Sequence, residues 1–123
     1  MTNYLFSELS VFFPAYNEEK NIKSTVLDAI RVLNNVAKKW EIIVIDDGSK
    51  DKTGEIVREL VKENSKYNLR LIIHIPNRGY GAALKSGFYN ASYSWIAFTD
   101  SDGQFDFSEI ALFFDKQKET GAD

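Results

Sequence analysis

The sequence predicts an α/β domain with an open, doubly wound and mostly parallel sheet. Three observations indicate this class: short apolar runs recur along the chain, segments with helical periodicity separate them, and capping residues stand where those helices would begin. A helix between successive strands returns the chain to the same end of the sheet, so the strands run parallel, and such connections are right-handed. Numbering the strands along the chain, we expect the order 3-2-1-4.

Four runs of apolar, β-branched and aromatic residues predict the strands. The runs are almost continuously apolar, as is typical of strands that are buried on both faces of a parallel sheet. They are Leu9–Phe13, Glu41–Ile45, Arg70–Ile75 and Trp95–Thr99.

Three stripes of apolar residues at helical spacing predict the helices that pack on this sheet. The stripes are Ile22, Val26, Ala29, Ile30 and Leu33; then Ile56, Val57, Leu60 and Val61; then the weaker set Ala83, Leu84 and Phe88. Asn17 precedes the first stripe, and Ser49 or Asp51 precedes the second, where helix caps are expected.

The C-terminal segment predicts one more helix. Asp106 and Glu109 have the spacing of a capping box before Ile110. The last residues, KETGAD, then read as the end of that helix, with Gly121 at the C′ position. We therefore expect a domain that is cut short at its C-terminal end, before a further strand.

Length and composition limit the classes of protein. The chain has 123 residues, of which 44% are hydrophobic, so it can bury one core and we expect a single domain over residues 1–123. A net charge of −3 without a block of like charge argues against nucleic acid as a partner. The lack of cysteine excludes disulfides and thiolate chemistry and suits a reducing compartment. The N-terminal residues contain neither a basic leader nor an apolar run long enough to span a membrane, so we expect a cytoplasmic protein.

Polar or glycine-rich residues follow every predicted strand. They are Pro14–Glu18, Asp46–Ser49, Pro76–Gly81 and Asp100–Gln104. In a doubly wound sheet, ligands bind outside the carboxyl ends of the strands, and these four segments would meet there. The pattern favours a binding site over ordinary solvated loops.

Two aspartates after the fourth strand predict a metal site. Asp100 and Asp102 are two residues apart on an extended exit, so their carboxylates point to one side and repel each other unless a cation lies between them. Oxygen ligands favour Mg²⁺ or Mn²⁺, and Gln104 could add an amide oxygen. The alternative is that both aspartates are solvated turn residues, whereas Asp106 is assigned to helix capping.

Acidic residues after the first two strands suit a nucleotide. Glu18, Asp46 and Asp47 only accept hydrogen bonds when ionised, and could bind the N–H edge of a base or the hydroxyls of a ribose. Tyr16 could lie against the base. The alternatives are that Asp47 makes a turn, that Glu18 favours the helix N-terminus, and that Tyr16 closes the edge of the core.

The segment after the third strand brings glycines to the start of a helix. Free N–H groups and the helix dipole can receive an anion there, and Arg78 and Lys85 could supply positive charge. The spacing of Gly79 and Gly81 matches neither common phosphate-binding motif, so a tight turn explains it equally well. His74, inside an apolar run, is predicted to be a hydrogen-bonded core residue and not a ligand or base.

Taken together, the four segments resemble a known family. The matching residues are PAYNE at 14–18, IDDGSKDKT at 45–53, NRGYGAA at 77–83 and DSDGQ at 100–104. The sequence resembles the N-terminal half of glycosyltransferase family 2 enzymes with the GT-A fold. The resemblance is greatest to polyprenyl-phosphate sugar transferases of the dolichol-phosphate mannosyltransferase type.

The resemblance implies a UDP- or GDP-linked sugar donor and a divalent metal. The implied nucleotide-binding residues are Pro14, Ala15, Tyr16, Glu18, Asp46, Asp47, Asn77, Arg78 and Gly81. The implied metal ligands are Asp100, Asp102 and Gln104, which would bind Mg²⁺ or Mn²⁺ and, through it, the diphosphate of the donor. Family members of this kind transfer the sugar with inversion in one displacement.

The resemblance also implies what this chain does not contain. The acceptor site and the general base of family members lie in a second half, so no catalytic base is assigned here. We expect transfer to a polyprenyl phosphate, an acceptor that is already anionic, with peripheral association at the cytoplasmic face of a membrane. The alternative is a non-catalytic nucleotide-binding or scaffolding fragment. A phosphorylatable receiver domain is disfavoured because its acidic pair would follow the first strand, and here the pair follows the second.

Overall fold

A computed structural model of the chain describes residues 3–101 and 105–121. The strands are β1 (Phe6–Ala15), β2 (Ala37–Asp46), β3 (Leu69–Ile73), β4 (Trp95–Phe98) and β5 (Ala111–Phe114). The helices are α1 (Ile22–Val36), α2 (Thr53–Glu63), α3 (Tyr80–Asn90) and α4 (Lys116–Gly121), and a 3₁₀ turn spans Phe107–Glu109. Strands and helices alternate as far as β4, which confirms the α/β class.

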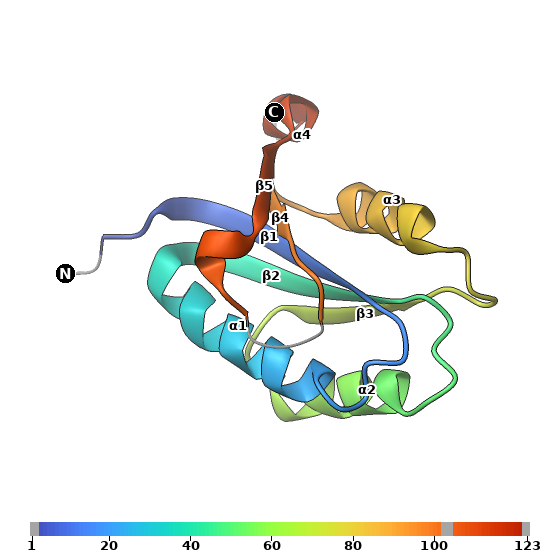
Figure 1. Cartoon of the computed structure of the whole chain (residues 1–123). Coiled ribbons are helices and arrows are strands. Elements are labelled where there is room, and N and C mark those ends of the chain that lie inside the picture. The colour runs from blue at the N-terminus through green and yellow to red at the C-terminus, as the bar shows by residue number, and fades with distance from the viewer. Residues whose placement is uncertain (1–2, 102–104, 122–123) are drawn as a thin grey trace.

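One sheet with the strand order β3-β2-β1-β4-β5 forms the centre of the fold (Figure 1). The pairs β3-β2, β2-β1 and β1-β4 are parallel, whereas β5 is antiparallel to β4. The predicted order 3-2-1-4 is therefore confirmed, and β5 extends the sheet by one strand at its edge.

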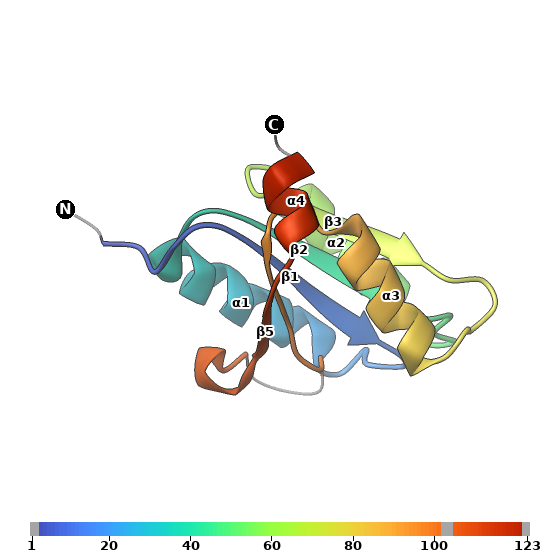
Figure 2. The same cartoon turned by 90° about the horizontal axis from the view of Figure 1, so that it is seen from above.

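The helices cover both faces of the sheet. Figures 1 and 2 show α1 and α2 on one face and α3 on the other. Successive side chains of a strand point to opposite faces, so Val11 and Phe13 of β1 pack in the cluster under α1 and α2, whereas Phe12 packs in the cluster under α3. The two covered faces explain why the strand sequences show no polar alternation.

Helix α3 lies directly on the aromatic side chain of Phe12. A Cβ atom built on Gly87 would lie 2.2 Å from the Phe12 ring, which is far inside van der Waals contact. The Phe12 ring also stacks on Phe98 at a centroid distance of 5.2 Å and meets Phe88 edge-on at 5.2 Å. Only glycine fits at position 87 with this helix placement.

The prediction of a helix that begins after Asp106 is wrong for residues 107–114, whereas the residues at its predicted C-terminal end do form a helix, α4. Asp106 does cap a turn, because its carboxylate accepts hydrogen bonds from the N–H and hydroxyl of Ser108, but the turn ends at Glu109. The sequence Ala-Leu-Phe-Phe then forms β5, in which Phe113 stacks on Phe98 of β4 with an interplanar angle of 4°. Pairing of aromatic side chains across the strands outweighs the local capping pattern.

The predicted caps of the first two helices are only partly confirmed. Helix α1 begins at Ile22, and Asn17 lies in the preceding loop, where its side chain accepts a hydrogen bond from the Lys50 N–H at 2.9 Å. At the start of α2, the carboxylate of Asp51 accepts the N–H of Thr53 at 2.9 Å. Asn17 therefore joins two loops instead of capping a helix.

A buried polar cluster lies on the α3 side of the sheet, away from the carboxyl ends of the strands. Glu41 of β2 is fully buried, and its carboxylate accepts hydrogen bonds from the hydroxyl of Ser10 (2.6 Å), the N–H and hydroxyl of Ser92 (2.5 and 3.1 Å) and the guanidinium of Arg70 (2.8 Å). Arg70 also donates to the carbonyl of Asn90, the last residue of α3. The cluster fixes the C-terminal end of α3 to the sheet.

None of the helices in residues 3–101 and 105–121 is long and apolar enough to cross a lipid bilayer.

Candidate functional site

The loops after β1 and β2 form one hydrogen-bonded unit at the rim of the sheet. The N–H of Asn17 donates to the hydroxyl of Ser49 at 2.8 Å, and the N–H of Glu18 donates to the hydroxyl of Thr53 at 2.8 Å. Asn17 has a φ angle of 54°, in the left-handed region that asparagine tolerates. These hydrogen bonds between the two loops fix the backbone position of Tyr16 and Glu18.

Asp51 supports the same unit from the start of α2. Burial raises the pKa of Asp51, but hydrogen bonds from the hydroxyl and N–H of Thr53 and the N–H of Glu19 outweigh it, so that the pKa lies below the ordinary value of 3.8. The carboxylate is therefore ionised at neutral pH and acts as a structural acceptor.

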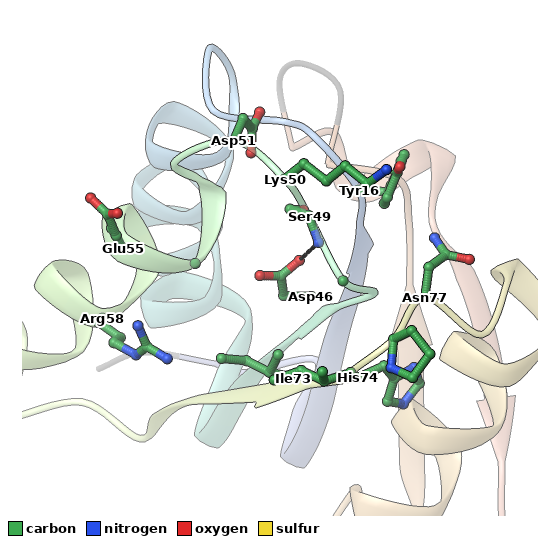
Figure 3. Close-up of a pocket in the computed structure, with 14 residues that line it drawn as sticks. Tyr16, Asp46, Ser49, Lys50, Asp51, Glu55, Arg58, Ile73, His74 and Asn77 are labelled. Atoms are coloured by element: carbon green, nitrogen blue, oxygen red, sulfur yellow. Dashed lines mark hydrogen bonds between the residues drawn. The ribbon is translucent and has the colours of Figure 1, made fainter.

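Asp46 ends β2 and faces the larger of two clefts at the rim. It is only 4% exposed, and its carboxylate accepts the N–H of Ser49 at 2.9 Å (Figure 3). The α carbon of Gly54 approaches so closely that a Cβ atom there would lie 2.9 Å from the second carboxylate oxygen. The side chain is thus held in one orientation at the wall of the cleft.

Asp47 binds the loop that follows β3. One carboxylate oxygen accepts the N–H of Arg78 and a ring nitrogen of His74, each at 2.9 Å, and the other accepts the N–H of Gly79 at 2.8 Å. The side chain of Asn77 donates to the Asp47 carbonyl at 2.9 Å. Burial raises the pKa of Asp47, but these donors lower it by more, to below the ordinary 3.8. The prediction that His74 is a hydrogen-bonded core residue is confirmed, since it is 4% exposed.

Two clefts lie side by side at the rim. The larger cleft, of about 560 Å³, lies between α2 and the segment after β3 (Figure 3), and is lined by Tyr16, Asp46, Gly48, Ser49, Lys50, Asp51, Gly54, Glu55, Arg58, Ile73, His74, Ile75, Pro76 and Asn77. The smaller cleft, of about 430 Å³, is lined by Pro14, Ala15, Tyr16, Glu18, Asp47, Asn77, Gly79, Tyr80, Ala83, Asp100 and Ser101. Tyr16 and Asn77 border both clefts.

The structure brings most of the sequence-predicted site residues to these clefts. Seven of the predicted nucleotide-binding residues line one cleft or both: Pro14, Ala15, Tyr16, Glu18, Asp46, Asp47 and Asn77. Arg78 and Gly81 line neither cleft, and both residues are exposed at the start of α3. Their predicted contact with a nucleotide stays a prediction.

Of the predicted metal ligands, only Asp100 lies within the described residues. Its exposed carboxylate borders the smaller cleft and accepts a long hydrogen bond of 3.5 Å from the hydroxyl of Tyr80. Burial, together with the negative charge of Asp100, raises the pKa of Tyr80. Asp102 and Gln104 lie outside the described residues. Within those residues, no three His, Cys, Asp or Glu side chains group closely enough to hold a metal ion.

Ser101 ties the segment after β4 to the first loop. It is 1% exposed, and its hydroxyl donates to the carbonyl of Pro14 at 3.1 Å. Asp100 thereby follows the strand next to Pro14 and Ala15, and all three residues line the smaller cleft. An exposed carboxylate at this point has the oxygen donor that a hard divalent cation requires.

Sequence reasoning missed several residues of the site. Arg58 of α2 and Ile75, which is 80% exposed, line the larger cleft, and Ser86 of α3 contacts His74. Arg58 lies outside the apolar stripe of α2, so nothing in the sequence distinguishes it from a solvent-exposed charged residue. Only the bend of the chain after β3 brings Ile75 and Arg58 to one cleft.

Comparison with solved structures defines the class of protein as one with a GT-A glycosyltransferase fold. The mannosyltransferase PcManGT from Pyrobaculum calidifontis, in complex with GDP-Man and Mn²⁺, is 29% identical with a TM-score of 0.71, over 79% of this chain and 28% of that one. TarS from S. aureus, in complex with UDP, is 26% identical with a TM-score of 0.69, over 94% of this chain and 31% of that one.

The chain belongs to glycosyl transferase family 2, whose model matches residues 10–123. Among its relatives, the dolichyl-phosphate beta-glucosyltransferase of Dictyostelium discoideum is 40% identical over 107 residues, which cover 83% of this chain and 33% of that protein. The name of this relative states glucosyl transfer, whereas the sequence suggested the mannosyl type. The chain spans about a third of the length of the curated relatives that it matches.

Proposed function

We propose that this chain is the donor-binding part of a glycosyltransferase that moves a hexose from a nucleoside-diphosphate sugar to a polyprenyl phosphate. The observation that carries the proposal is the pair of adjoining clefts, with the carboxylate of Asp46 on one and that of Asp100 on the other. Membership of family 2 and the dolichyl-phosphate relatives support the reaction class and the acceptor.

The donor would lie across both clefts. The base and ribose would occupy the larger cleft, where Asp46 can accept from the base N–H or a ribose hydroxyl and Tyr16, 44% exposed, can lie against the ring. The diphosphate and sugar would reach into the smaller cleft toward Asp100. The proposed nucleotide-binding set is that predicted from the sequence: Pro14, Ala15, Tyr16, Glu18, Asp46, Asp47, Asn77, Arg78 and Gly81.

Positive charge beside the smaller cleft would complement the diphosphate. The N–H groups in the first turn of α3 have no hydrogen-bond partners within the helix. Gly79 caps the N-terminal end of α3, and Arg78 directly precedes Gly79. A guanidinium and a helix N-terminus both favour a phosphate oxygen over a neutral group. This gives Arg78 a role although its side chain lies outside the cleft walls.

Asp100, with Asp102 and Gln104, would hold a Mg²⁺ or Mn²⁺ ion. The exposed carboxylate of Asp100 fits this role, and the solved structure of the Pyrobaculum mannosyltransferase contains Mn²⁺ with a sugar nucleotide. When bound, the ion supplies a Lewis acid for the departing nucleoside diphosphate. Asp100 would orient the donor in the smaller cleft.

The acceptor accounts for the lack of an assigned base. A lipid phosphate is already anionic, so it can attack the anomeric carbon directly and invert it without proton removal. Its lipid chain would place the protein peripherally at a membrane, and we propose the cytoplasmic face. The acceptor site itself would belong to the part of the relatives that this chain does not span.

Calorimetric titration of the purified chain with UDP and with GDP tests the proposal. In the presence of Mn²⁺ we expect one of the two nucleotides to bind. Asp100→Asn should lower the affinity for this nucleotide by about tenfold or more, because the proposed metal site loses a negatively charged ligand. Asp28→Asn removes the same charge from α1, away from the rim, and should leave the affinity unchanged.

Three results would each contradict a specific part of the proposal. Equal affinity with EDTA in place of Mn²⁺ would remove the metal. Binding of neither nucleotide under any condition would remove the donor site. Nucleotide binding without sugar transfer to a polyprenyl phosphate by a longer chain that contains this one would favour a binding fragment over an enzyme.

A further inference from the structure

A series of three side chains, two of them buried and Ser86 half-buried, connects the end of β2 to the middle of α3. His74 contacts the Asp47 carboxylate through Nδ1 at 2.9 Å and the hydroxyl of Ser86 through Nε2 at 2.6 Å. Asp47 and His74 are 5% and 4% exposed. An Asp–His–Ser series is typical of hydrolases, but here the ring is buried and Ser86 lies on the face of α3 toward the sheet, so it is not available as a nucleophile.

The hydrogen-bonding roles in this series follow from the ionised state of Asp47. A carboxylate only accepts, so Nδ1 of His74 carries the proton and donates it. Nε2 lies 2.6 Å from the hydroxyl of Ser86, a group that can both donate and accept a hydrogen bond. Every polar atom of the series has a partner, which makes one orientation of His74 strongly preferred.

Asp47 transmits this orientation to the loop beside both clefts. Its two oxygens accept the N–H groups of Arg78 and Gly79, and its carbonyl accepts the side chain of Asn77. Gly79 has a φ angle of 97° and directly precedes α3. The backbone of residues 77–79 is therefore shaped by one carboxylate, whose own position depends on His74.

We infer that His74 and Ser86 are positioning residues for the donor site: they hold the Asp47 carboxylate so that it shapes the loop of residues 77–79 between the two clefts. Asp47, a member of the proposed nucleotide-binding set, then also acts on the donor through this loop. The inference rests on the proposed function for its effect on nucleotide affinity, but its effect on the loop is independent of any ligand.

Amide hydrogen exchange measured by NMR on the ligand-free chain tests the effect on the loop. In His74→Leu, we expect the N–H groups of Arg78 and Gly79 to exchange at least about tenfold faster, because their acceptor loses its orientation. His74→Asn should restore slow exchange, since its amide nitrogen occupies nearly the place of Nδ1. Ser86→Ala should give an intermediate increase at the same two amides.

Ser10→Ala is the matched control, because it also removes one hydroxyl donor from a buried acidic cluster on the α3 side of the sheet. It should leave exchange at Arg78 and Gly79 unchanged relative to the rest of the chain. Unchanged exchange at these amides in His74→Leu would overturn the inference. So would an equal acceleration at all sheet amides, which would show a general contribution to stability only.

Calorimetry with UDP and GDP in Mn²⁺ separates this inference from the proposed function. We expect His74→Leu to weaken the bound nucleotide by about tenfold and His74→Asn to recover most of the loss. If the wild-type chain binds neither nucleotide, the proposed function fails and the exchange data alone decide the role of His74. If the wild type binds and His74→Leu binds equally, the positioning role in donor binding is wrong.

Discussion

Asp46 and Asp47 are neighbours in the sequence, but their carboxylates contact different parts of the rim. Asp46 accepts from Ser49 three residues on and faces the larger cleft. Asp47 accepts from Arg78 and Gly79, more than thirty residues away. The sequence predicts that both are acceptors, because that is a property of the side chain. It cannot predict the partners of Asp47, because they depend on how the segment after β3 approaches β2.

The lowered pKa of Asp47 predicts acid-sensitive stability. The folded chain holds this carboxylate ionised below the ordinary pKa of 3.8, so its contribution is complete above that pH and is lost as pH falls through the folded pKa. We expect Asp47→Asn to lower the free energy of unfolding in urea by about 2 kcal/mol at pH 7, and by clearly less at pH 3. The Asp28→Asn variant serves as the control for loss of one charge. If Asp47→Asn lowered the free energy of unfolding by the same amount at pH 7 and at pH 3, this expectation would be contradicted.

Glu41 predicts a large effect away from the proposed site. Its fully buried carboxylate accepts from Ser10, Ser92 and Arg70, and an amide would turn a donor toward at least one of them. Glu41→Gln should lower the free energy of unfolding by about 2 to 4 kcal/mol, measured by urea denaturation. Glu8→Gln, on the exposed start of β1, should change it by less than about 0.5 kcal/mol. Similar small effects for both variants would show that the buried cluster contributes little.

At the scale of elements, the apolar periodicities predicted β1 to β4 and α1 to α3 because those segments bury the residues that make the pattern. The prediction failed after Asp106, where a local capping pattern competed with strand pairing. Phe113 and Phe114 gain contacts with Phe98 and Trp95 of β4 that no local pattern shows. Edge strands of this kind are decided by the neighbouring strand, which the sequence alone does not place.

Two glycines of α3 predict opposite effects of the same substitution. Alanine normally stabilises a helix relative to glycine by about 1 kcal/mol, and a Cβ atom on Gly81 would have no neighbouring atom within 4 Å to oppose this gain. Gly87→Ala would instead drive a methyl group into the Phe12 ring and should cost about 1 to 3 kcal/mol. Thermal unfolding of the two variants without ligand checks the signs. A stabilised Gly87→Ala would show that α3 can move away from the sheet.

At the scale of the whole molecule, the four rim loops were predicted to meet because parallel strands end at one edge. The structure shows the loops after β1, β2 and β3 together, and Asp100 lines the smaller cleft with them. The division of the rim into two clefts could not be predicted, since it arises from Tyr16 and Asn77, which approach from different loops. The metal ligands Asp102 and Gln104 remain predictions from the sequence.

The packing of the two core clusters predicts a single unfolding transition. β1 and β2 contribute side chains to both clusters, so neither face of the sheet can open without exposing the other. Far-UV circular dichroism should report the same midpoint as tryptophan fluorescence in a Trp95→Phe variant, in which only Trp40 remains. Separate midpoints for the two signals would show that the layers under α1 and under α3 unfold independently.

Helix α3 is anchored at both ends to β2 and the residue that follows it. Asp47 holds the N–H of Gly79 at one end, and Glu41 holds that of Ser92 at the other. Glu41 and Asp47 are six residues apart, which is about 20 Å in an extended strand. This distance is close to the length of the eleven-residue helix α3, roughly 16 Å, together with its flanking residues. The distance between the two carboxylates on this strand therefore fixes the length of the helix. One residue inserted into α3 would rotate the residues beyond it by about 100° about the helix axis, so the hydrogen bond at one of the two ends would be lost.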